Sequence, residues 1–244
     1  MALLISVQLN PVTRWVSSGN VDVQRRCGSG RFISSRNISS RSSALFSFLF
    51  RHDSVPPFPK SLLAQTFLAG KELRCCYKAT IDGFSASEFH DRCDFKGPCV
   101  IVGKTVKGFR FGAFNPEGYR STDDYYDTFD AFLFYWPSDG PETSTPIVLK
   151  KVGGSGAALF DYARGGPQFG ADGLLIGAPL APVMGGFAGP DTNSGVGELT
   201  EARSRLGLSY ALRPDGKDSL FGEEKRVTLV EIEVFCSPAI ADLY

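Results

Sequence analysis

The stretch VTLVEIEVFC, residues 227–236, alternates in the way that is typical of a β-strand. Successive side chains of a strand point to opposite faces, so the ten residues divide into two sets. The first set is apolar and the second is mixed: Thr228, Val230, Ile232, Val234 and Cys236 against Val227, Leu229, Glu231, Glu233 and Phe235. The sequence therefore predicts a strand between a hydrophobic core and a partly solvated surface.

Other short β-rich runs precede this strand along the chain. PCVIVGKTV (98–106) and FRFGAF (109–114), separated by Lys107-Gly108, predict a hairpin. Further strands are expected in FDAFLFYW (129–136), PIVLKKV (146–152), AALFDYA (157–163), DGLLIGA (172–178) and RLGLSYAL (205–212). Many short strands and few helices predict a mostly β (α+β) fold, with two antiparallel sheets packed as a sandwich and a few short flanking helices.

One short helix is predicted within DGFSASEFHDRCD, residues 82–94. Ser85 at the N-cap and Glu88 three residues later form a capping box, and Phe84 and Phe89 occupy the two positions of a hydrophobic staple. Gly97-Pro98 follows soon after and ends the helix. These cues give the polar residues of the stretch a structural role.

The same stretch holds residue types that are common in catalysis, but their spacing does not favour it. His90 and Cys93 are three residues apart, so their side chains lean the same way and do not converge on a substrate. DDYYDTFD (123–130) lacks the spacing of a calcium loop and reads as a solvated loop, and GGSGAALF (153–160) lacks the Lys-Ser/Thr of a phosphate loop. We predict no catalytic residue, no metal site and no cofactor, and hence a protein that is not an enzyme.

Six cysteines are present, at positions 27, 75, 76, 93, 99 and 236, and none forms a C-x-x-C pair. His90 is the single histidine after residue 52, so a zinc site of the Cys₂His₂ type is excluded by ligand count. Buried free thiols in a reducing compartment are expected.

The first 59 residues differ in composition from the rest. They hold seven arginines, no lysine and two aspartates, which gives +5 in a chain of zero net charge. Arg-rich, Ser-rich and acid-poor sequence is typical of an organelle transit peptide, so we predict a disordered transit-like segment over 1–57 and a plastid location, with the mitochondrion or the cytosol as alternatives. VPPFPK (55–60) marks the boundary to a domain over 58–239, followed by a tail over 240–244.

The remaining residues carry −5, which gives no electrostatic reason to expect nucleic-acid binding. ALFSFLF (44–50) is seven residues long, far below the roughly 20 that span a bilayer, so no membrane span is predicted. Residues 179–204 form a long glycine-rich stretch, and a loop of that length is either functional or disordered.

Several blocks resemble the TLDc family of oxidation-resistance proteins, in the same order along the chain. They are CCYKATIDGFSASEFHDRCDFKGP (75–98), FGAFNP (111–116), DAFLF (130–134), GPQFGADGLLI (166–176), LGLSYAL (206–212) and VTLVEIEVF (227–235). The first block is the most specific. LLIGAP (174–179) and the glycine-rich loop depart from the family pattern.

The resemblance implies a two-sheet sandwich and a non-catalytic protein-interaction domain that supports resistance to oxidative stress. Some members regulate a proton-pumping ATPase, so one of its subunits is an implied partner, and we expect a monomer. The candidate binding residues are those of the family motif, most of them with structural roles: Asp82, Gly83, Phe84, Ser85, Phe89, His90, Cys93, Asp94 and Gly97. The alternative is a redox-active protein that uses Cys75, Cys93 or Cys99 as oxidant-reactive thiols.

Overall fold

A computed structural model describes residues 52–137, 145–153, 158–178 and 197–243, together with the backbone of 181–183 and 186–188. Predictions for residues 1–51, and those for much of the loop 179–204, lie outside these described residues. In the described part the fold is mostly β and antiparallel with a few short helices, which confirms the expected class.

Eleven strands form one hydrogen-bonded sheet in the order β4-β7-β8-β9-β12-β13-β2-β3-β5-β6, with β1 paired to β13. A separate pair joins β10 to β11. The bounds are β1 Arg74–Lys78, β2 Cys99–Thr105, β3 Arg110–Asn115, β4 Asp124–Tyr126, β5 Phe132–Tyr135, β6 Ile147–Lys150, β7 Leu159–Asp161, β8 Gln168–Phe169, β9 Leu174–Ile176, β10 Ala181–Val183, β11 Gly186–Ala188, β12 Glu201–Arg203 and β13 Arg226–Cys236.

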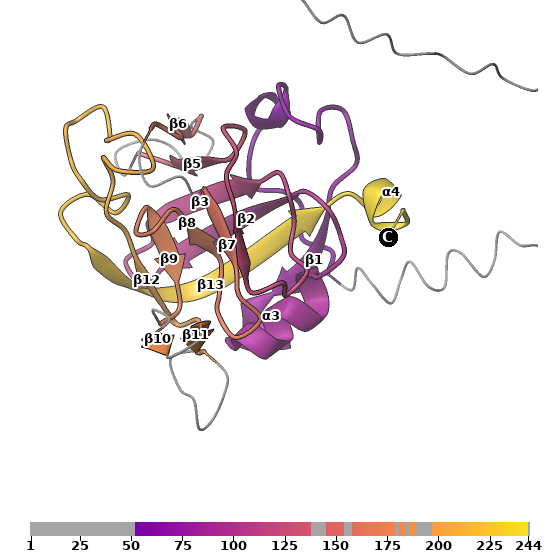
Figure 1. Ribbon diagram of the computed structural model, residues 1–244. Coiled ribbons are helices and arrows are strands. Elements are labelled where there is room, and N and C mark those ends of the chain that lie inside the picture. The colour runs from indigo at the N-terminus through magenta and orange to yellow at the C-terminus, as the bar shows by residue number, and fades with distance from the viewer. Residues whose placement is uncertain are drawn as a thin grey trace, which may run out of the picture. The chain divides into compact units, whose positions relative to one another are not determined.

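The longest strand, β13, joins the two halves of this sheet, and Figure 1 shows it as the long yellow arrow through the fold. Its first residues pair with β12, and the rest pairs with β2 along one edge and β1 along the other. The two sheets expected from the sequence are therefore the halves on either side of β13. The predicted hairpin is confirmed as β2 and β3.

The buried face of β13 changes sides along the strand. Val227 and Leu229 are buried in its first part, whereas Ile232 and Val234 are buried in its second part. Leu229 faces Thr105 and Glu231 faces Lys104, so Val230 is an extra residue, a β-bulge that reverses the alternation. The prediction of one apolar face from Thr228 to Cys236 is therefore wrong for the first part of the strand, where Thr228 and Val230 are exposed.

Two hydrophobic clusters hold the fold together. The larger one takes side chains from both halves of the sheet, for example Phe111 and Leu133 from one and Phe169 and Ile176 from the other. The smaller one lies on the opposite face of β13 and β2, around Phe235 and Val100. There, Leu63, Leu68 and Phe58 of the preceding segment cover the sheet, so Phe235 is buried as well.

The helices are short. They are the 3₁₀ helix η1 (Lys60–Leu63), α2 (Ala79–Asp82), α3 (Ala86–Cys93) and α4 (Pro238–Ala241). Among the described residues, no helix has both the length and the apolar character needed to cross a bilayer.

Three local predictions are wrong. Residues 179–204 are not loop throughout, because Glu201–Arg203 forms β12 between β9 and β13, and Ala181–Val183 pairs with Gly186–Ala188 as β10 and β11. RLGLSYAL (205–212) is not a strand, because its one ladder contact is an isolated bridge between Lys151 and Tyr210. DDYYDTFD (123–130) is not loop throughout, because Asp124–Tyr126 forms β4 at one end of the sheet.

Candidate functional site

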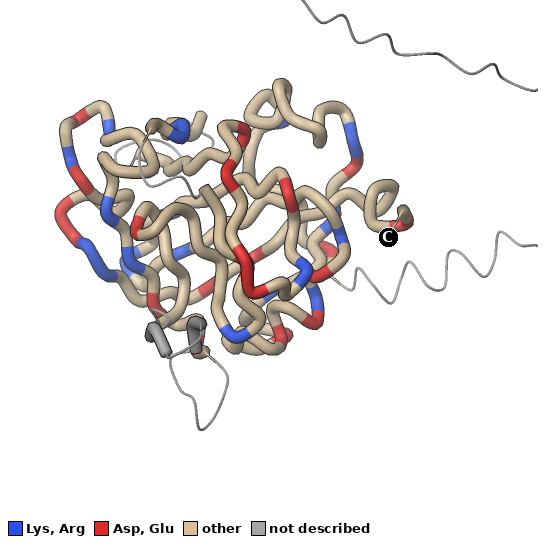
Figure 2. The backbone as a smooth tube through the Cα atoms, in the orientation of Figure 1, with Lys and Arg blue, Asp and Glu red and all other residues tan. Residues whose placement is uncertain are grey.

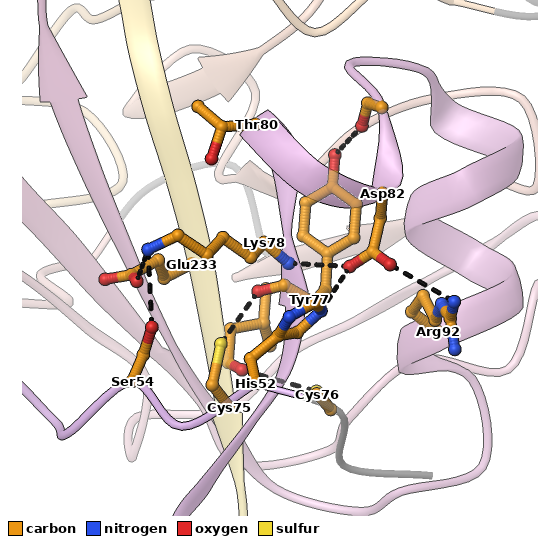
Figure 3. Close-up of polar contacts among 12 residues, drawn as sticks. His52, Ser54, Cys75, Cys76, Tyr77, Lys78, Thr80, Asp82, Arg92 and Glu233 are labelled. Atoms are coloured by element: carbon orange, nitrogen blue, oxygen red, sulfur yellow. Dashed lines mark hydrogen bonds and ion pairs between the residues drawn. The ribbon is translucent and has the colours of Figure 1, made fainter. Parts of the chain in front are cut away.

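Asp82, at the end of α2, joins three separate parts of the chain (Figure 3). Its carboxylate, 3% exposed, accepts hydrogen bonds from the ring of His52 at 2.7 Å and from the backbone N–H of Lys78 at 2.9 Å. The guanidinium of Arg92 on α3 lies 3.2 Å from its second oxygen. Burial strengthens each of these charge-assisted contacts, and the carboxylate is enclosed by His52, Lys78 and Arg92.

The predicted start of α3 is confirmed. Ser85 is the N-cap, and its hydroxyl accepts a hydrogen bond from the backbone N–H of Glu88 at 3.2 Å. Phe84 and Phe89 both pack into the larger core cluster. Gly83 has φ +114°, a conformation that side chains rarely adopt, and Tyr77 donates its hydroxyl proton to the Gly83 carbonyl at 2.7 Å.

The buried side chain of His90, at the end of α3, bridges two neighbouring segments. Its Nε2–H donates to the carbonyl of Gly165 at 3.0 Å, and its Nδ1–H donates to Asp94 at 2.8 Å. Burial lowers the pKa of His90, but the hydrogen bond and charge of Asp94 outweigh burial and raise it overall. The geometry is that of a positively charged imidazole held between two acceptors.

Ser121 completes this cluster, but it is not placed to act as a nucleophile. Its hydroxyl donates to Asp94 and lies 3.1 Å from His90 Nδ1. Activation of a serine needs an imidazole nitrogen that can take its proton, whereas both nitrogens of His90 already donate to other acceptors. The cluster fixes the loop of Ser121 against α3.

A buried carboxylate on β7 holds the backbone of that loop. Asp161 accepts hydrogen bonds from the backbone N–H groups of Arg120, Ser121 and Thr122, at 2.9, 3.2 and 3.3 Å. Ligand atoms of His90, Asp94 and Asp161 lie within 4.8 Å of one another, a spacing that could hold a metal ion. Each atom already has a protein partner, and a cation would have to displace the Nδ1 proton of His90, so the arrangement favours a structural ion pair.

The described cysteines are free and buried, as predicted. Burial raises the pKa of Cys75 to about 12 and raises that of Cys93. For Cys99, the hydrogen bond from Cys236 lowers the pKa, but burial and neighbouring thiols raise it overall. A reactive thiol needs exposure and a low pKa, so the folded state does not favour direct reaction of these three with oxidants.

A family model described as the TLDc domain matches residues 60–236. The chain belongs to the TLDc family. No curated protein matches it. The match confirms the resemblance seen in the sequence blocks, and it connects the chain with a family that is associated with oxidative-stress resistance and with protein interaction.

The TLDc motif residues named from the sequence fall into several structural roles. Asp82, Ser85, His90 and Asp94 make the contacts described above, Phe84 and Phe89 pack into the core, and Gly83 and Gly97 have positive φ values of +114° and +70°. Cys93 is buried in the same core, away from the His90 contacts.

Sequence reasoning missed the partners of these residues. His52 and Ser54 lie ahead of the expected domain start, yet they contact Asp82 and Lys78. Other partners come from distant positions: Ser121 is 27 residues from Asp94, and Gly165 is 75 residues from His90. Asp161 binds the backbone of the Ser121 loop. No local pattern in the sequence marks them, because their role depends on packing.

Proposed function

We propose that this TLDc chain is a non-catalytic interaction domain that supports resistance to oxidative stress by binding a protein partner. A subunit of a proton-pumping ATPase is the partner to test first, since some family members regulate such a pump. The chain is proposed to act as a monomer.

The observation that supports this proposal is how the polar residues of the motif are engaged. Asp82, Ser85, His90 and Asp94 each bond to backbone groups or to neighbouring side chains of the same fold. These four side chains therefore have structural roles. Binding of a partner at the protein surface fits the site better than catalysis does.

Exposed apolar side chains near β4 are the part of the surface to test for this contact. Tyr125 is 60% exposed and Phe129 is 73% exposed. Large exposed rings beside polar residues are characteristic of protein interfaces. Along the loop 213–226 the surface is charged instead: Figure 2 shows basic and acidic residues side by side there, and Arg213 pairs with Asp215 and Lys225 with Asp218.

The test is capture of the pump from a membrane extract by the purified full chain. The wild type and Ser87→Ala, an exposed control on α3, are expected to retain a pump subunit identified by mass spectrometry. Tyr125→Ser/Phe129→Ser is expected to lose the subunit while still unfolding cooperatively in urea. Some stability is lost as well, because Phe129 contacts the ammonium of Lys151 and Tyr125 contacts Phe160. Failure of the wild type to retain any pump subunit from its own compartment would contradict the proposal.

We also propose a plastid location and a plant-type protein, supported by the Arg-rich and Ser-rich composition of the first 59 residues. Residues 1–60 fused to a fluorescent protein are expected to enter plastids, and a fusion without them is expected to stay outside. A cytosolic signal from the first fusion would contradict the location and would direct the pump experiment to the vacuolar membrane.

A further inference from the structure

Two thiols that are far apart in the sequence meet in the larger core cluster. Cys76 Sγ on β1 and Cys236 Sγ on β13 lie 3.1 Å apart, although 160 residues separate them. Both side chains are buried, at 1% and 0% exposed. No disulfide joins them, since both thiols are free.

A second β-bulge places Cys76 beside its partner. Cys75 faces Phe235 and Tyr77 faces Val234, so Cys76 is the extra residue of β1. Cys75 and Cys76 consequently point to different sides of the strand (Figure 3), Cys75 into the smaller cluster and Cys76 into the larger one. Of the two adjacent cysteines, Cys76 is the one brought to Cys236.

The positive charge of Lys96 acts on Cys76 and Cys93. Lys96 is 7% exposed, and its ammonium makes no hydrogen bond or ion pair with any residue that the structure describes. Burial raises the pKa of Cys76 and Cys93, and the charge of Lys96 acts against that rise. A thiolate at Cys76 would be stabilised by this nearby positive charge.

We propose that Cys76 and Cys236 form a two-electron redox site, which a low-molecular-weight disulfide such as glutathione disulfide oxidises to a bridge between β1 and β13. The site differs from peroxide scavenging by Cys75, Cys93 or Cys99, and it does not depend on any protein partner.

The reaction proceeds by two thiol–disulfide exchanges. The Cys76 thiolate attacks one sulfur of glutathione disulfide, and one glutathione leaves. Cys236 then attacks Cys76 Sγ, and the second glutathione leaves. Two electrons pass from the protein thiols to glutathione disulfide, and the two thiol protons end on the two glutathione molecules.

Access to the pair requires β1 to separate from β13, because neither sulfur is exposed in the closed fold. β1 is suited to this, since its ladder partner is β13 and its other edge carries an isolated bridge to His52. Oxidation is therefore slow and follows opening. Once formed, the bridge closes a loop of 160 residues and opposes unfolding.

The test equilibrates the full chain with glutathione buffers of increasing disulfide content, blocks free thiols in denaturant and identifies linked peptides by mass spectrometry. The expected product is a Cys76–Cys236 linkage with the loss of two hydrogens, and a rise in the urea midpoint of unfolding. Protein oxidised in urea serves as the control, in which linkages among the cysteines are expected to be mixed.

Three variants test the roles of single residues in forming the Cys76–Cys236 linkage. Cys236→Ala is expected to abolish the linkage, and Cys75→Ser, next in sequence to Cys76 but on the other face of β1, is expected to leave it unchanged. Lys96→Met is expected to slow oxidation several-fold after correction for its free energy of unfolding, and an unchanged corrected rate would overturn the role of Lys96. The proposal is overturned if the wild type keeps both thiols free in the most oxidising buffer, or if Cys76 links equally to Cys93.

Discussion

Single side chains around α3 stabilise the fold through contacts that can be tested one at a time. Asp82 has partners in three parts of the chain, Ser85 caps a helix, and His90 joins the helix to two loops. The three differ in burial and in the number of partners, so their removal is expected to cost different amounts of stability.

Replacement of Ser85 by alanine is expected to lower the free energy of unfolding by about 1 kcal/mol, because the N–H of Glu88 loses its acceptor. Urea denaturation measures the change. Ser85→Asp should retain most of the stability, and Ser87→Ala, two residues further on and exposed, should have no effect. Equal losses for Ser85→Ala and Ser87→Ala would argue against the cap.

Replacement of Asp82 by alanine is expected to cost more, about 3 kcal/mol, since it leaves the guanidinium of Arg92 and the N–H of Lys78 without their buried acceptor. The matched control is Glu72→Ala. Glu72 pairs with Arg74 at 2.8 Å but is 69% exposed, so its loss should change stability by less than about 1 kcal/mol. The idea of Asp82 as a structural centre fails if the two variants are equally stable.

Strand irregularities decide which side chains reach the core. Val230 on β13 and Cys76 on β1 are extra residues, and each reverses the inward and outward alternation of its strand. The reversal lets β13 present apolar residues to both halves of the sheet. A regular strand of the same sequence would bury Thr228 and Val230 in place of Val227 and Leu229.

Deletion of Val230 is therefore expected to abolish cooperative unfolding, because it turns one half of β13 to the wrong face. Deletion of Gly216, in the turn after Arg213, is the control and is expected to leave a folded protein. Circular dichroism with urea titration distinguishes the two. A cooperative transition near that of the wild type after loss of Val230 would show that the bulge is dispensable.

The stability of the whole molecule is expected to depend on pH through His90. Its pKa in the folded state is raised above the ordinary 6.5, so its contribution is fully present below pH 6.5 and is lost as pH rises through the folded pKa. The other charged groups that face the imidazole are Asp94 from its own helix and Asp161 from β7. Both carboxylates stabilise the charged ring.

The measurement is the free energy of unfolding of the wild type and His90→Asn between pH 6 and 9. The wild type should lose stability as the pH rises above 6.5, and the variant should show a flatter profile. If both profiles fall in parallel, His90 is not the group that titrates.

The start of α3 and the β2–β3 hairpin could be predicted from the sequence because their cues are local. The N-cap Ser85 and the Glu88 N–H that it accepts from are three residues apart, and a short turn that contains Gly108 joins the two strands of the hairpin. The β-rich class and the TLDc family follow from short blocks read in order. Burial of the cysteines also follows from composition, since thiols in such a chain tend to lie in the core.

The partners of the motif residues were decided by tertiary structure. His90 meets Gly165 from 75 residues away, and Cys76 meets Cys236 from 160 residues away. Two β-bulges determine which way the side chains of β1 and β13 point, and no residue type in either strand predicts these bulges. The physical reason is that local hydrogen bonds fix where an element begins and ends, whereas long-range packing fixes which of its faces is buried.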